Sequence, residues 1–196
     1  MIKTIGHSNH PIEKFIDLLV RGGVALLVDV RSMPYSRRFP HFSREQLQKS
    51  LSEAGIDYVW EGEALGGMAK SVKSYGEAAA RPEFKAALDR VIGTAAETPL
   101  CLMCAEKEPM DCHRTVLVSR RLVERGAAVE HLLADGTART HAHIEEALLR
   151  KAGADLFDDR ATLADPSTPA EFGAFIAREM ATWAEVVKAT GTKPGN

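Results

Sequence analysis

The 196-residue sequence predicts an α/β fold of three layers, in which a mostly parallel sheet carries helices on both faces and a helix is appended at the C-terminus. Short β-rich apolar runs alternate with segments whose apolar residues recur at helical spacing, which is typical of βαβ units. The run 24–30 (VALLVDV) is apolar almost throughout, as in a strand buried on both faces of a parallel sheet. We expect the α/β domain over residues 1–152, and a linker with the appended helix over 153–196.

The first strand is expected at residues 2–5, which are short and β-rich. From Ile12, apolar residues at i, i+3, i+4 and i+7 predict a helix that ends at the glycine pair 22–23. The strand 24–30 follows and leads into a loop over 31–42.

A second helix is expected after this loop. Ser43 and Gln46 have the spacing of a capping box, and Gly55 marks the end of the helix. Residues 58–60 then predict a short third strand.

The second half of the domain repeats the alternation of strands and helices. Helices are predicted from residue 82 to 92, from 113 to 125 and from 141 to 151. The remaining strands are predicted over 100–105 and 127–133.

Composition excludes several classes of protein. No run approaches the roughly 18 consecutive apolar residues of a membrane span, and the N-terminus lacks the apolar core of a signal peptide, so we expect a cytoplasmic protein that does not bind membranes. The net charge of −2 gives no overall attraction to nucleic acid. Three cysteines are too few, and odd in number, for a disulfide framework.

Polar and ionisable residues stand where the predicted strands end. Ligands of open parallel sheets bind beyond the carboxyl ends of the strands, and neighbouring strands lie only about 4.8 Å apart, so these groups converge if their strands are adjacent. For Asp29 and Arg31, the alternative is a structural ion pair. The residues that we assign to catalysis are His7, Asp29, Glu106, Cys112 and His113, and those that we assign to substrate or anion binding are Ser8, Arg31, Arg37 and Arg114.

The segment 31–44 is the clearest charge feature. It carries four arginines, three aromatic residues and no acid, in a chain that is otherwise slightly acidic. Arginine suits bidentate phosphate recognition, and aromatic rings stack on bases. A phosphate-bearing small molecule or a nucleic acid is therefore the expected partner, and the alternative is a solvated loop whose aromatic residues pack into the core.

The cysteines allow a further interpretation. Cys101 and Cys104 are three apart in a predicted strand and therefore point to opposite faces, which argues against a metal or redox motif made by this pair. Cys112 lies just before a helix, where the dipole lowers a thiol pKa. A mixed site of Cys104, Cys112, His113 and His7 stays open, but the spacing alone assigns no metal ligand and identifies no cofactor.

Five short motifs follow one another along the chain: 4–8 (TIGHS), 29–32 (DVRS) with Pro34 and the pair 36–37, 65–67 (LGG), 104–106 (CAE) and 112–114 (CHR). In this order they resemble the domain-of-unknown-function family 488. The resemblance covers about residues 2–150 and implies a small bacterial or archaeal cytosolic α/β protein, with no activity attached.

The C-terminal residues 163–194 resemble another family, the last helix of the periplasmic solute-binding receptors of tripartite tricarboxylate transport. The receptor domains are absent, so the resemblance implies a fused or convergent helix and no solute binding. Thr168 and Glu171 form a capping box that opens an amphipathic helix of about 20 residues. Its apolar face is expected to dock on the α/β domain or to form a homodimer.

Three functions follow from these patterns. The first is an enzyme that acts on a nucleotide or nucleic-acid phosphate compound at the carboxyl ends of the strands. The second is a non-catalytic nucleic-acid or anion-binding module that uses the arginine-rich loop. The third is a thiol or metal enzyme centred on Cys104 and Cys112.

Overall fold

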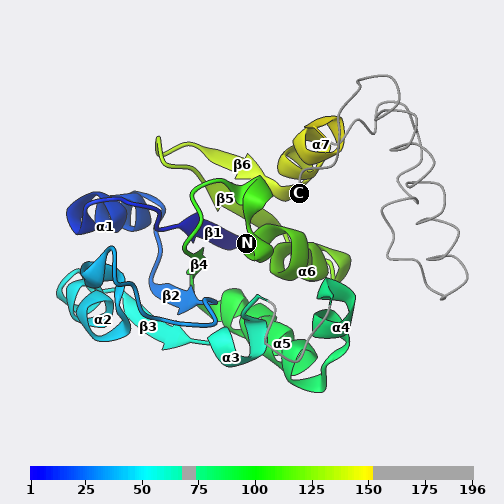
Figure 1. Ribbon diagram of the computed structural model, residues 1–196, viewed down its shortest axis with the longest axis horizontal. Helices are drawn as coiled ribbons and strands as arrows, with labels where there is room; N and C mark the ends of the chain where they lie inside the picture. Colours follow the sequence, from blue (N-terminus) through cyan, green and yellow to red (C-terminus); the bar gives the residue numbers. More distant parts are fainter. Residues whose placement is uncertain (68–73, 152–196) are drawn as a thin grey trace, which may run out of the picture. The chain divides into compact units, whose positions relative to one another are not determined.

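The computed structural model describes residues 1–67 and 74–151, and within them the chain forms one sheet of six strands (Figure 1). The strand order is β3-β2-β4-β1-β5-β6, in which all neighbours are parallel except β5 and β6. The expected mostly parallel α/β fold is therefore confirmed. The strands are β1 (Ile2–Gly6), β2 (Leu26–Asp29), β3 (Asp57–Trp60), β4 (Leu100–Cys104), β5 (Val129–Leu132) and β6 (Ala138–Thr140).

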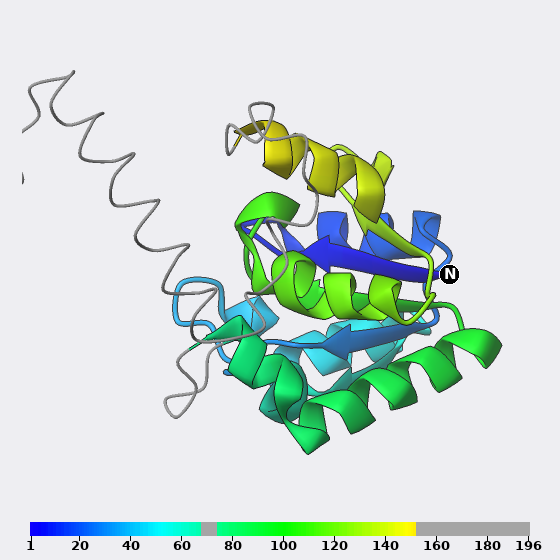
Figure 2. The ribbon, with the colours of Figure 1, turned by 90° about the vertical axis from the view of Figure 1, so that its right-hand side faces the viewer.

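Helices cover both faces of the sheet, as Figures 1 and 2 show. A short 3-10 turn, η1 (Pro40–Phe42), precedes the second helix, and another, η2 (Pro109–Asp111), precedes a π-helical segment, η3 (Arg114–Ser119). The α-helices are α1 (Ile12–Arg21), α2 (Arg44–Glu53), α3 (Gly62–Leu65), α4 (Tyr75–Ala80), α5 (Pro82–Glu97), α6 (Arg120–Glu124) and α7 (His141–Lys151).

Two hydrophobic cores lie on opposite faces of the sheet. One packs α1 and α2 through Phe15 and Leu47, and the other packs α5 and the π-helical segment through Phe84 and Leu117. Residues of β4 alternate between these cores, because successive side chains of a strand point to opposite faces. Cys101 belongs to the first core and Cys104 to the second, which confirms that these two thiols do not face each other.

Two local expectations are wrong. β6 was not predicted, because Ala138–Thr140 is exposed and its three residues (ART) carry no apolar alternation. The capping box at Ser43 does not form: no side-chain cap is present, and the Ser43 hydroxyl instead accepts a hydrogen bond from the backbone N–H of Ser36 at 3.2 Å. The hydroxyl thus stabilises the loop before α2 rather than the helix itself.

The expected linker and appended helix over 153–196 lie outside the described residues. None of the helices in the described part of the chain is long and apolar enough to cross a membrane.

Candidate functional site

A cavity of about 830 Å³ opens at the carboxyl-terminal edge of the sheet. Its walls come mainly from the loops after β1, β2 and β4. These loops meet because β4 lies between β1 and β2, with Gly6 opposite Cys104 and Asp29 opposite Met103. The backbone N–H of His7 continues the ladder by donating to the carbonyl of Cys104 at 2.9 Å. Residues that the sequence places far apart therefore share one cavity.

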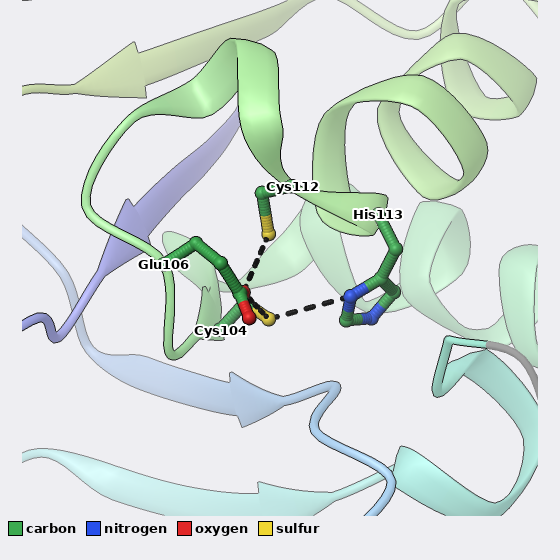
Figure 3. Close-up of side chains that lie close together, drawn as sticks. All are labelled: Cys104, Glu106, Cys112 and His113. Carbon is green, nitrogen blue, oxygen red and sulfur yellow. Dashed lines mark hydrogen bonds between the residues drawn. The ribbon is translucent and has the colours of Figure 1, made fainter. Parts of the chain in front are cut away.

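Four side chains converge beside this cavity, three of them in its lining, and form what we call the Cys–Glu–His cluster (Figure 3). Their ligand-type atoms, two sulfurs, one carboxylate oxygen and one ring nitrogen, all lie within 4.8 Å of one another. Glu106 Oε2 is 2.8 Å from the sulfur of Cys104 and 3.1 Å from that of Cys112. Both cysteines are buried, whereas Glu106 is exposed. The cluster consists of Cys104, Glu106, Cys112 and His113.

The orientation of His113 follows from a hydrogen bond across the sheet edge. Its Nε2 lies 3.1 Å from the carbonyl oxygen of Val30, which can only accept, so Nε2 carries a proton. Nδ1 lies 3.4 Å from Cys104 Sγ. The neutral ring therefore presents its lone pair to the cluster.

The two thiols differ in acidity. The hydrogen bond with Cys104 lowers the pKa of Cys112. Burial opposes this shift, but the hydrogen bond with His113 and the charge and backbone N–H of Arg114 also lower this pKa. The same hydrogen bond with Cys112, together with burial, raises the pKa of Cys104. At His113, burial lowers the pKa of the imidazole, but hydrogen bonding to Cys112 raises it, and the net shift is upward. Cys112 is therefore the more acidic of the two thiols.

The loop that carries Glu106 is held from two sides. A Cβ atom on Gly6 would lie 1.8 Å from the Glu106 carbonyl oxygen, so only glycine permits this approach of β1 to the loop. Arg114, fully buried, donates from Nη1 to the same carbonyl oxygen at 2.6 Å and from Nη2 to that of Lys107 at 3.3 Å. These contacts place the Glu106 side chain beside the sulfurs.

Asp29 and Arg31 form a buried ion pair behind the cavity. Arg31 donates to both carboxylate oxygens of Asp29, from Nε at 2.9 Å and from Nη2 at 2.6 Å. Tyr58 adds a third side-chain donor to Asp29 at 2.8 Å. Burial, followed by the charge of Asp29, raises the pKa of Tyr58. The structural ion pair that the sequence left open is therefore present.

Arg31 has little capacity left for a ligand. Four of its five side-chain N–H groups have partners among the described residues: two on Asp29, one on the carbonyl of Phe42 and one on Nε2 of His7. Arg31 lines the cavity but is only 5% exposed. Arg31 therefore has one N–H, at Nη1, left to donate to an anion.

The sequence-predicted residues fall into three places. His7, Ser8, Arg31, Glu106 and His113 line the cavity. The other four predicted residues do not line it: three of them are buried, Asp29, Cys112 and Arg114, and Arg37 is exposed.

Sequence reasoning missed two basic residues of the cavity. Arg38 and Lys107 line it, in contrast to Arg37. The arginine-rich composition of segment 31–44 pointed to this loop, but no local pattern distinguishes Arg37 from Arg38. Lys107 had no signal beyond its position one residue after Glu106.

The fold and the site define an α/β protein with a Cys–Glu–His cluster at the carboxyl-terminal edge of a parallel sheet. The family model of the domain of unknown function DUF488 matches residues 11–121. This match covers more than half of the sequence, so the chain belongs to that family, as the motifs predicted. The matched residues include the whole cluster but begin after His7. No curated protein and no solved structure matched the chain significantly.

Proposed function

We propose that this protein is an enzyme that acts on a phosphate-bearing substrate, a nucleotide or a nucleic acid, bound in the cavity at the carboxyl ends of the strands. The observation that carries the proposal is that the cations Arg38 and Lys107 line the same cavity as Cys104, Glu106 and His113. Cationic side chains thus share one cavity with a thiol, a carboxylate and an imidazole, which supports the proposal.

The binding end of the cavity is cationic and rich in hydrogen-bond donors. Arg38 is exposed and lies over the ring of Phe39, 5.5 Å from its centroid, so its guanidinium can reach a ligand without desolvation of a buried charge. Lys107 is 3.8 Å from Glu108, a loose surface pair that a phosphate can replace. Ser8, Ser32 and Ser36 add hydroxyl groups to the lining.

The reacting end is the Cys–Glu–His cluster. Burial opposes ionisation of Glu106, but the hydrogen bonds from Cys104 and Cys112 lower the pKa of its carboxyl group. Glu106 is therefore a carboxylate at neutral pH and can accept a proton from a substrate or from water. His7 has a different role, because both of its ring nitrogens are engaged by Ser8 and Arg31 and it orients Arg31.

Calorimetry with pyrophosphate and a series of nucleotides tests the binding half of the proposal. Arg38→Ala removes a charge-assisted contact and is expected to weaken binding about tenfold, equivalent to about 1.4 kcal/mol. Arg37→Ala is the matched control, since this neighbouring arginine does not line the cavity. Equal losses in both variants would mean diffuse attraction and no phosphate site.

Turnover is tested separately on a library of nucleotides and short oligonucleotides. Glu106→Gln is expected to abolish turnover while it leaves pyrophosphate binding intact. Tight binding without turnover of any phosphate compound would instead support the non-catalytic binding module.

A further inference from the structure

The Cys–Glu–His cluster carries an inference that is independent of the substrate. We propose that it binds one divalent metal ion of the zinc class, with Cys104 Sγ, Cys112 Sγ and His113 Nδ1 as fixed ligands and Glu106 as a fourth, exchangeable ligand at the cavity wall.

The separations of the donor atoms are close to those that such an ion requires. Zn–S bonds of about 2.3 Å and Zn–N bonds of about 2.0–2.1 Å at tetrahedral angles place sulfur and nitrogen about 3.6 Å apart. Cys104 Sγ and His113 Nδ1 are 3.4 Å apart. Glu106 Oε2, at 2.8 and 3.1 Å from the two sulfurs, has to withdraw by roughly half an ångström, which its exposed side chain allows.

The surroundings already orient the ligands. A metal-bound histidine commonly donates its other ring N–H to a carbonyl or carboxylate, and His113 does so from Nε2 to Val30. The backbone N–H of Arg114 lies 3.4 Å from Cys112 Sγ and donates to it. The buried guanidinium of Arg114 supplies a positive charge next to a site of two thiolates and one carboxylate.

The donor set selects the class of ion. Two thiolates and an imidazole favour zinc, or Fe²⁺ and Co²⁺ in the same geometry, over Mg²⁺ and Ca²⁺, which take oxygen ligands. Three buried or half-buried ligands and one exposed carboxylate resemble a reactive centre more than a closed structural site, because displacement of Glu106 opens a coordination position to the cavity.

Metal binding to the full-length protein, kept reduced, tests the proposal without any substrate. We expect about one equivalent of zinc per chain after loading and dialysis. Co²⁺ is expected to bind at the same place, to give thiolate-to-cobalt charge-transfer absorption, and to be displaced by Zn²⁺. The absence of this absorption in the folded wild-type protein would overturn the proposal.

Variants assign the ligands. Cys104→Ser and His113→Ala each replace a ligand. We expect the affinity for zinc to fall by more than the roughly 10- to 100-fold that is typical when a residue hydrogen-bonded to a ligand is replaced. Cys101→Ser, on the same strand but in the opposite core, is the matched control and is expected to keep its zinc and its cobalt spectrum. Wild-type affinity in folded Cys104→Ser or His113→Ala protein would contradict the site, and if a variant does not fold, the cobalt spectrum of the wild-type protein decides.

Glu106→Gln is expected to retain the ion with weaker affinity and an altered cobalt spectrum. An unchanged spectrum would remove Glu106 from the ligand set and contradict the proposed fourth position. Phosphate binding is measured by separate calorimetry, so failure of the metal site and failure of the proposed substrate class are distinguishable.

Discussion

The guanidinium of Arg31 sets the tautomer of His7. The guanidinium Nη1 of Arg31 lies 3.2 Å from Nε2 of His7 and can only donate, so this nitrogen carries the lone pair. Nδ1 of His7 donates to the carbonyl of Ser8 at 2.9 Å. Burial, and then the charge of Arg31, lowers the pKa of His7 to about 4. Burial and a residue after β2 thus together favour the neutral form of a residue after β1 that lines the cavity.

The first prediction concerns the Asp29–Arg31 pair. Arg31→Gln leaves the fully buried carboxylate of Asp29 without its cation, and we expect a loss of about 3–5 kcal/mol in the free energy of unfolding. Urea denaturation measures this loss. The double variant with Asp29→Asn is expected to be less destabilised than the sum of the two single variants.

Arg21→Gln is the control for this prediction. Arg21 pairs with Asp17 on the surface of α1, where an ion pair contributes about 0–1 kcal/mol. If Arg31→Gln were no more harmful than Arg21→Gln, the Asp29–Arg31 pair would not stabilise the base of the site.

The second prediction concerns a pair of buried histidines away from the site. Nε2 of His131 is 3.1 Å from Nδ1 of His141, and Thr4 is 2.7 Å from the other ring nitrogen of His131. Burial, and then the charge of His141, lowers the pKa of His131 from 6.5 to about 3. The unfolded chain therefore binds more protons than the folded chain between these two pH values.

Stability is accordingly expected to fall as the pH decreases from 6.5, by up to about 1.4 kcal/mol per pH unit from His131 alone. Urea denaturation between pH 6.5 and 5 measures the slope. His131→Gln is expected to make it shallower, and His143→Gln, exposed on α7, is expected to leave it unchanged. A wild-type slope in His131→Gln would contradict the assignment.

The third prediction concerns the approach of β1 to the Glu106 loop. Gly6→Ala would place a methyl group 1.8 Å from a backbone oxygen, which cannot move aside as a flexible side chain can. We expect lower stability and weaker zinc binding, measured by urea denaturation and metal titration. Gly93→Ala is the control, because a Cβ there meets nothing within 4 Å and alanine in α5 is expected to stabilise the protein by about 0.5–1 kcal/mol.

The fourth prediction concerns Arg114. Arg114→Lys cannot reach the carbonyl oxygens of Glu106 and Lys107 with the same two donors, and a carbonyl left unpaired costs up to about 1–3 kcal/mol where it is shielded from water. We expect a loss of that size in the free energy of unfolding. Arg121→Lys, in a surface pair with Glu124, should stay within about 0.5 kcal/mol of the wild type. Similar losses in both variants would mean that Arg114 does not hold the loop.

The sequence by itself determined the elements and the edge at which the site lies. Apolar spacing is a local property, so it predicted most of the strands and helices, and the period of two along β4 correctly separated Cys101 from Cys104. Polar residues at the ends of apolar strands marked His7 and Glu106, which do line one cavity. The sequence does not predict β6, because a short exposed strand has no apolar pattern.

Only the tertiary structure decided which groups the candidate site residues contact. The order of strands, with β4 between β1 and β2, depends on which apolar faces are buried together, and no local pattern contains it. The role of an arginine depends on its neighbours in space: Arg114 and Arg31 are occupied by carbonyls and by Asp29, whereas Arg38 faces the cavity. Likewise, Cys104 and His113 are nine residues apart, and their donor atoms meet at 3.4 Å because the chain turns back over the end of β4. Packing and hydrogen-bond saturation, which are non-local, determine these contacts.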